Sequence, residues 1–251
     1  MSAFAGFART FLRVALYPPL ALTAFGDYLF SGASASLPAR VKWLHRVALL
    51  HAKWLGMRVR VHGPVPTSGL IVANHLGYLD IIGLANAGKF SFISKHEVAG
   101  WPVFGAYARK GATIFVNREQ RGSVADVVTQ MREHVAAGVP IVFFPEGTST
   151  GGDTVLPFRS SLFEPVVQLG CSIAACGLHY SLPGGSVADE VAYWRDMDFA
   201  PHLFNLLRRT GLTLDVHFGP SQPRTADRKA LAREMHAEVC ALAGLPGRPE
   251  K

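Results

Sequence analysis

A histidine and an aspartate stand five residues apart in the segment Asn74-His75-Leu76-Gly77-Tyr78-Leu79-Asp80. Five residues turn a regular helix by roughly 500°, so the two side chains cannot share one helical face. They can meet if His75 lies in a loop after a strand and Asp80 lies in the first turns of the next helix, with Gly77 allowing the bend. A carboxylate on one imidazole nitrogen leaves the other nitrogen free to accept a proton, as a general base requires. The same pair could also cap a helix for purely structural reasons. Of the ten histidines, His75 alone has an aspartate at this offset.

A second polar segment, FFPEGTSTGGD, runs from Phe143 to Asp153 and allows two interpretations. Its G-x-S-x-G pattern could mark Ser149 as the nucleophile of a serine esterase, which sits on a sharp turn between a strand and a helix. Its Pro-Glu-Gly-Thr part could instead form a rigid loop that holds a polar substrate. The Gly-Gly-Asp run after Ser149 favours a loop over a helix. We therefore favour the substrate loop, with the serine esterase as the rival.

The elements around these segments alternate between strands and helices. Apolar runs predict strands at 57–61, 70–73, 90–94, 112–116, 139–144, 172–179 and 212–218, and helical spacing predicts helices at 38–56, 78–87, 121–137, 161–169 and 225–243. In the first of these helices Val41, Leu44, Val47 and Leu55 form one apolar stripe. This alternation predicts an α/β layered domain with a mostly parallel or mixed central sheet flanked by helices.

Charge and composition distinguish the N-terminal region from the rest. The chain has 251 residues, a net charge of +7 and no linker-like segment. Residues 1–60 contain eight basic residues and one acidic residue, which accounts for the whole excess, and they include a long apolar stretch. Basic charge beside apolar helix favours an anionic membrane surface as a partner, and the absence of a nucleic-acid motif argues against nucleic acid. We expect membrane-interface helices over 1–56 and a catalytic domain over 57–251.

The apolar stretch from Val14 to Gly26 contains Pro18-Pro19 at its centre. It is shorter than the roughly 20 residues of a simple membrane span. We predict an uncleaved pair of helices, broken at the two prolines, that lies in the membrane interface. A cleaved signal peptide is the alternative, because Ala33-Ser34-Ala35 resembles a cleavage site.

Cysteines and the remaining histidines give no convincing metal site. The three cysteines lack the C-x-x-C spacing of a zinc knuckle. His236 and Cys240 are four apart on a predicted helix, but two ligands alone make a poor site. His96-Glu97 lacks the second histidine of H-E-x-x-H. We therefore predict neither a bound metal nor a disulfide framework.

Three motifs in order, NHLGYLD, FVNREQR and FFPEGTS, resemble those of the glycerolipid acyltransferases of the 1-acylglycerol-3-phosphate acyltransferase type, over roughly residues 38–220. The resemblance implies His75 as general base, Asp80 as its orienting partner and no acyl-enzyme. It implies an acyl-CoA or acyl carrier protein thioester as donor, a lysolipid as acceptor, and no other cofactor. The residues expected to bind the acceptor are Arg118, Glu146, Gly147 and Thr148, with Asn74 and Arg159 as further candidates.

Two departures bear on the acceptor. Ser149 stands where that family carries an arginine, and residues 172–176 lack the proline of its fourth motif. We expect the acceptor to be 1-acyl-sn-glycerol-3-phosphate, giving phosphatidic acid. The alternative is lyso-ornithine lipid, whose head group has no phosphate. The variant EGTST resembles the branch of the family that acylates this lipid. We expect a monotopic enzyme associated with the cytoplasmic face of the inner membrane. A membrane-binding protein without enzymatic activity would account for the N-terminal helices but not for His75 and Asp80.

Overall fold

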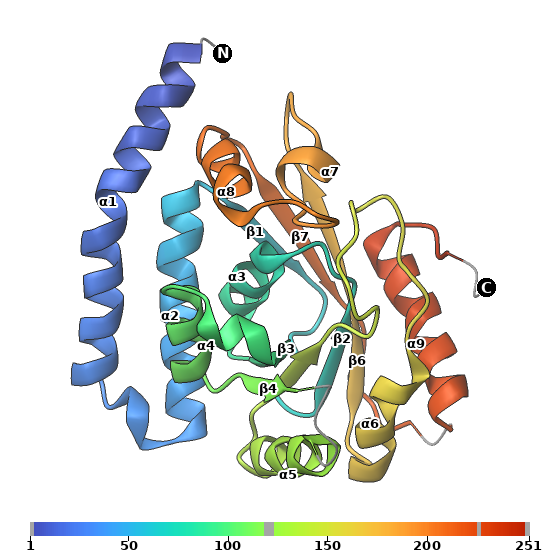
Figure 1. The fold of residues 1–251 in the computed structure, drawn as a ribbon. Helices are drawn as coiled ribbons and strands as arrows, with labels where there is room; N and C mark the ends of the chain where they lie inside the picture. Colours follow the sequence, from blue (N-terminus) through green and yellow to red (C-terminus); the bar gives the residue numbers. More distant parts are fainter. Residues whose placement is uncertain (1–2, 118–122, 225–226, 249–251) are drawn as a thin grey trace.

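The computed structural model describes residues 3–117, 123–224 and 227–248. A seven-stranded sheet forms its centre, with helices on both faces (Figure 1). The strands are β1 (Arg58–His62), β2 (Leu70–Ala73), β3 (Ser91–Lys95), β4 (Ile114–Val116), β5 (Ile141–Phe143), β6 (Ile173–Ser181) and β7 (Thr213–Phe218). Their order is β1-β7-β6-β2-β5-β3-β4, and the neighbours pair in parallel except for β6 and β7, which are antiparallel. The predicted α/β class and mixed sheet are confirmed, with each strand end within two residues of the prediction.

The helices alternate with the strands along the chain. They are α1 (Ala3–Phe30), α2 (Leu37–Leu55), α3 (Tyr78–Ala87), α4 (Phe104–Lys110), α5 (Ser123–Ala136), α6 (Glu164–Leu169), α7 (Val187–Glu190), α8 (Phe199–Leu207) and α9 (Arg228–Ala243). The helices predicted from 38 to 243 are confirmed to within three residues at their ends, although residues 160–163 form a separate 3-10 turn before α6. The sequence did not predict α4, α7 and α8, because at seven, four and nine residues they are too short to show a clear helical period.

The two faces of the sheet bury two separate sets of apolar side chains. Along β2, Ile71 and Ala73 pack with α2 and α3, whereas Leu70 and Val72 pack with α5 and α9 on the other face. All four side chains are completely buried, as expected for a central parallel strand covered by helices on both faces. β1 lies at the edge of the sheet and exposes most of its side chains, so the half-buried strand predicted at 57–61 is less buried than expected.

Helix α1 runs without interruption through Pro18 and Pro19, so the prediction of two helices broken at these prolines is wrong (Figure 1). The two prolines remove two backbone N–H groups, but packing against the rest of the protein keeps the helix continuous. The buried guanidinium of Arg13 donates to the carbonyl oxygens of Leu55 at 2.6 Å and Leu207 at 3.0 Å, at the ends of α2 and α8. Trp54 of α2 in turn donates its indole N–H to the carbonyl of Arg13.

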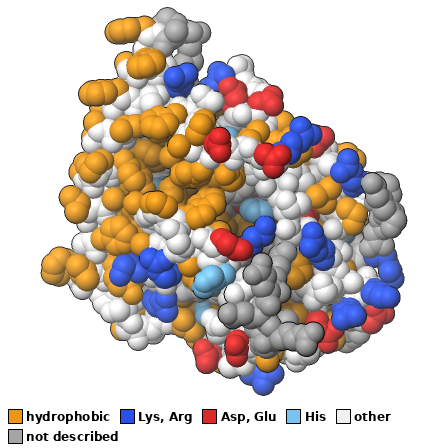
Figure 2. Space-filling view, in the orientation of Figure 1, with side chains coloured by type: hydrophobic (Ala, Val, Ile, Leu, Met, Phe, Trp, Pro, Cys, Tyr) orange, Lys and Arg blue, Asp and Glu red, His pale blue; other side chains and the backbone are white. Residues whose placement is uncertain are grey.

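The outward face of α1 is apolar. Phe4, Phe11 and Leu22 are 83%, 77% and 73% exposed. They are spaced seven and eleven residues apart, close to two and three helical turns, so they lie in one line along the helix. Figure 2 shows the resulting concentration of hydrophobic side chains over α1 and α2. Within residues 3–117, 123–224 and 227–248, no helix has the length and apolar character needed to cross a membrane.

Candidate active site

His75 and Asp80 meet as their spacing predicts. β2 ends at Ala73, so His75 lies in the loop that follows, and Asp80 lies in the first turn of α3. The imidazole Nδ1 and the Asp80 Oδ2 are 2.8 Å apart. Gly77 makes the turn between them with φ 151°, where a side chain would come within 2.9 Å of Tyr193.

The carboxylate of Asp80 is completely buried and surrounded by donors. Its Oδ2 also accepts the backbone N–H groups of Leu76 at 2.7 Å and Gly77 at 3.0 Å, and its Oδ1 accepts the hydroxyl of Tyr180 at 2.9 Å. Because both oxygens of Asp80 already accept from N–H or O–H donors, Nδ1 of His75 acts as the donor in their hydrogen bond. The Nε2 of His75 then holds the free lone pair that a general base needs.

The imidazole faces a cleft of about 350 Å³. Its side chain is 25% exposed and stacks on the ring of Phe144 with ring centres 4.2 Å apart. The cleft is lined on one side by the His75 loop and on the other by Gly147, Thr148 and Ser149. The structure therefore brings together the two polar segments singled out in the sequence.

Glu146 is placed behind this wall of the cleft and is only 2% exposed. Its Oε1 accepts the backbone N–H of His75 at 2.7 Å, and its Oε2 accepts that of Leu156 at 2.8 Å. Burial raises the pKa of Glu146 to about 8, although the two N–H groups act in the opposite direction. Both oxygens are engaged by the main chain, so Glu146 joins the His75 loop to the following loop and presents no free oxygen to the cleft.

The substrate loop is held in place by further bonds. Thr150 donates its backbone N–H to the carbonyl of His75 at 2.9 Å, and Arg159 donates its own to Pro145 at 2.9 Å. Gly147 has φ 73°, and its Cα lies against the guanidinium of Arg159, which would be 2.8 Å from an added Cβ. Arg159 is thus exposed beside the predicted acceptor loop.

Ser149 does not have the surroundings of a nucleophile. Its hydroxyl donates to the backbone carbonyl of Tyr193 at 2.6 Å. The chain after it continues as turns and irregular structure until the 3-10 turn at 160–163, whereas a nucleophile elbow requires a helix at once. This geometry argues against the serine esterase interpretation.

Two other predicted acceptor residues fall outside the cleft or outside the described structure. The amide of Asn74 is buried and bonds both the N–H and the carbonyl of Leu178, which ties β2 to β6. Asn74 therefore has a structural role in this arrangement. Arg118 lies outside the residues that the structure describes.

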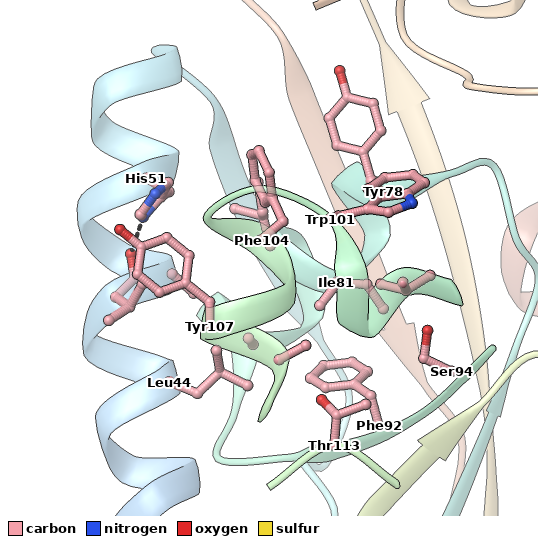
Figure 3. Close-up of a pocket in the computed structure, with 16 residues that line it drawn as sticks. Leu44, His51, Tyr78, Ile81, Phe92, Ser94, Trp101, Phe104, Tyr107 and Thr113 are labelled. Atoms are coloured by element: carbon pink, nitrogen blue, oxygen red, sulfur yellow. Dashed lines mark hydrogen bonds between the residues drawn. The ribbon is translucent and has the colours of Figure 1, made fainter. Parts of the chain in front are cut away.

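An apolar pocket of about 100 Å³ adjoins the cleft (Figure 3). The two share Tyr78, Ile81 and Trp101 in their walls. In Figure 3 the pocket lies between α2 and α4, and Leu44 of α2 and Tyr107 of α4 form part of its wall. Part of an acyl tunnel is an expectation for the N-terminal helices, but the sequence does not predict which residues line this pocket. The apolar stripe over 38–56 was its only sequence signal, and such a stripe is equally typical of an ordinary core helix.

Comparison with known proteins agrees with this geometry. The family model described as Acyltransferase matches residues 58–179. The chain is 35% identical to a lyso-ornithine lipid O-acyltransferase of Brucella abortus, over 94% of each chain. It is 28% identical to a 1-acyl-sn-glycerol-3-phosphate acyltransferase of Neisseria gonorrhoeae, over 75% of this chain and 74% of the relative. The crystal structure of the LPA acyltransferase PlsC of Thermotoga maritima has the same fold, with a TM-score of 0.72, 17% identity and 97% coverage of both chains. This chain therefore belongs to the acyltransferase family that includes these enzymes and is an O-acyltransferase of lysolipids.

Proposed function

We propose that the protein transfers a fatty acyl group from an acyl thioester to the hydroxyl of lyso-ornithine lipid, with His75 as general base. The observation that carries the chemistry is the 2.8 Å bond between Nδ1 of His75 and the buried Asp80, which directs Nε2 at the cleft. Nε2 takes the proton of the acceptor hydroxyl as its oxygen attacks the thioester carbonyl. The carbon–sulfur bond then breaks, and the leaving thiolate recovers the proton from the imidazolium. The reaction therefore needs neither a protein nucleophile nor a further cofactor.

The apolar pocket between α2 and α4 supports the thioester part of this proposal. Its lining includes Leu44, Val47, Phe92 and Phe104, and it shares wall residues with the cleft that contains His75. A fatty acyl chain placed there would gain free energy from burial, at about 25 cal/mol for each Å² of apolar surface. The donor thioester, of CoA or of acyl carrier protein, would then lie beside the imidazole.

The choice of lyso-ornithine lipid rests on the relatives and on Ser149. Relatives from Brucella abortus and Rhizobium meliloti, at 35% and 36% identity, bear the name lyso-ornithine lipid O-acyltransferase. At position 149 the protein has a serine bonded to a carbonyl, where the phosphate-acylating type it resembles carries an arginine. A guanidinium is well suited to bind phosphate, so its absence favours a head group without phosphate.

The second candidate is acylation of 1-acyl-sn-glycerol-3-phosphate to phosphatidic acid. It is supported by the relatives of that name in two Neisseria species, each 28% identical to this chain. An acceptor assay separates the two candidates. Purified protein is given acyl-CoA or acyl carrier protein thioester together with one acceptor at a time, and His75→Ala serves as the blank. We expect turnover of lyso-ornithine lipid to exceed that of the phosphate acceptor. Preference for the phosphate acceptor would establish the second candidate instead.

We further propose a monotopic association with anionic lipid, on the cytoplasmic face of the inner membrane. It is supported by the exposed line of Phe4, Phe11 and Leu22 on α1 and by the basic excess of residues 1–60. Deleting α1 would expose the ends of α2 and α8 that Arg13 now contacts, so a substitution is the cleaner test. We expect the triple variant with serine at positions 4, 11 and 22 to lose sedimentation with vesicles that contain anionic lipid, with its circular dichroism unchanged. Retained binding would show that another surface makes the contact.

A further inference from the structure

At the edge of the sheet, β1 and β7 bring two histidines and an aspartate together. The strands pair in parallel with His62 opposite His217 and Arg60 opposite Asp215. Paired and alternate residues of neighbouring strands share a face, so His62, His217 and Asp215 project to the same side. Their potential ligand atoms all lie within 4.8 Å of one another. The sequence analysis missed this group because His62 and Asp215 are far apart along the chain.

We propose that this edge of the sheet binds a divalent transition metal ion, with zinc as the best match, through His62, Asp215 and His217. Imidazole nitrogen and carboxylate oxygen are the usual ligands of Zn²⁺, at about 2.0–2.2 Å from the metal. Ligand atoms in a tetrahedral site are then about 3.4 Å apart. Reaching these separations requires one of the two stacked imidazoles to rotate, and the half-exposed side chain of His62 has room to do so.

The present contacts show how the ion would be accommodated. His62 Nε2 lies 2.8 Å from Asp215 Oδ1, so a metal would replace the proton that this pair now shares. The rings of His62 and His217 are nearly parallel, at 9°, with their centres 4.2 Å apart. One ring must turn so that both nitrogens face the same ion. The backbone beneath them is fixed by continuous strand pairing, which limits the adjustment to the side chains.

Two further side chains, those of His179 and Arg60, lie near the proposed metal site. His179 of β6 pairs with Asp215 across the sheet but is not part of the group whose ligand atoms lie within 4.8 Å of one another. Arg60 opposes binding, because its guanidinium is 4.0 Å from Asp215 Oδ1, but this side chain is largely exposed and can turn to solvent.

The position of the group suggests a structural effect on the edge strand. β1 is the last strand of the sheet and lies next to β7, so an ion held by His62 and the two β7 residues would cross-link them. His75 follows β2, which is separated from β7 by β6. We therefore expect bound zinc to raise thermal stability, with His62 and His217 variants retaining acyltransferase activity.

The test is titration of untagged, chelator-treated protein with Zn²⁺ by isothermal calorimetry, together with thermal unfolding. We expect one ion per chain, a raised unfolding midpoint, and at least a tenfold loss of affinity in both His62→Ala and His217→Ala. His96→Ala, which removes an exposed imidazole elsewhere, is the matched control and should bind as the wild type does. Circular dichroism establishes that each variant is folded. Absence of one-to-one binding, or affinity within tenfold of wild type in either His62→Ala or His217→Ala, would overturn the proposal.

Discussion

Two segments frame the catalytic histidine, and each contributes one buried carboxylate. In residues 74–80, Asp80 binds the imidazole of His75, two backbone N–H groups and a tyrosine hydroxyl. In residues 144–156, Glu146 binds two backbone N–H groups, one of them that of His75. The first carboxylate therefore acts on the side chain of the base, and the second acts on its main chain. General-base catalysis thus has two requirements, which different carboxylates meet: the proton must be on Nδ1 of the imidazole, and the ring must be held in position.

The largest effect is expected from the first segment. His75→Ala removes the base, and we expect the acyl-transfer rate to fall by about 10³-fold. Asp80→Asn keeps the shape but removes the charge that holds the proton on Nδ1, so we expect a fall of about 10²-fold or more. Rates are measured with saturating thioester and acceptor, and circular dichroism and vesicle binding establish that both variants are folded. Activity near wild type in His75→Ala would remove the imidazole from the mechanism.

An intermediate effect is expected from the second segment. Glu146→Ala leaves the buried N–H groups of His75 and Leu156 without their acceptor, which costs about 1–3 kcal/mol for each. We expect a lower melting temperature and a kcat reduced by about 10- to 100-fold, because the His75 loop loosens. The KM for the acceptor should change much less. The exposed Glu133→Ala is the matched control and should leave both constants unchanged. A raised KM with normal kcat in Glu146→Ala would instead indicate that Glu146 binds the acceptor.

A smaller effect, on selectivity, is expected at Ser149. Ser149→Arg places a guanidinium in the cleft wall, and we expect the ratio of kcat/KM for the phosphate acceptor over lyso-ornithine lipid to rise about tenfold, or about 1.4 kcal/mol. Ser149→Ala removes only the hydroxyl and is the control. It should retain activity and leave the ratio unchanged. Loss of activity in Ser149→Ala with normal folding would revive the nucleophile interpretation.

The first segment could be predicted from the sequence because its bonds are local. A strand end, a glycine turn and a helix start lie within seven residues, and their geometry is enough to bring His75 to Asp80. The apolar runs that predict the strands are equally local, and the seven strands were located for that reason. The contact of Asp80 with Tyr180 is the exception, because Tyr180 lies in β6 and reaches Asp80 only through the pairing of β2 with β6.

The second segment could be predicted only in part. The sequence indicates a loop at Glu146, but the bond to His75 joins residues 71 positions apart and depends on the pairing of β2 with β5. The motif therefore predicts that Glu146 binds the acceptor, whereas in the structure its buried carboxylate accepts main-chain N–H groups. The same limit applies to α1, where the local signal of Pro18 and Pro19 was outweighed by distant contacts of Arg13 with α2 and α8.

The last effect, on stability rather than on activity, concerns the protonation of Glu146. Burial raises the pKa of Glu146 from 4.5 to about 8, so the folded protein binds this proton more tightly than the unfolded chain does. The stability from this proton is fully present below the unfolded pKa and is lost as the pH rises towards 8. Glu146→Gln cannot titrate, so we expect the wild type to lose about 1–3 kcal/mol more than this variant in urea unfolding between about pH 5 and about pH 8. Parallel losses in the two proteins would mean that Glu146 does not take up this proton, and that its two N–H donors outweigh its burial.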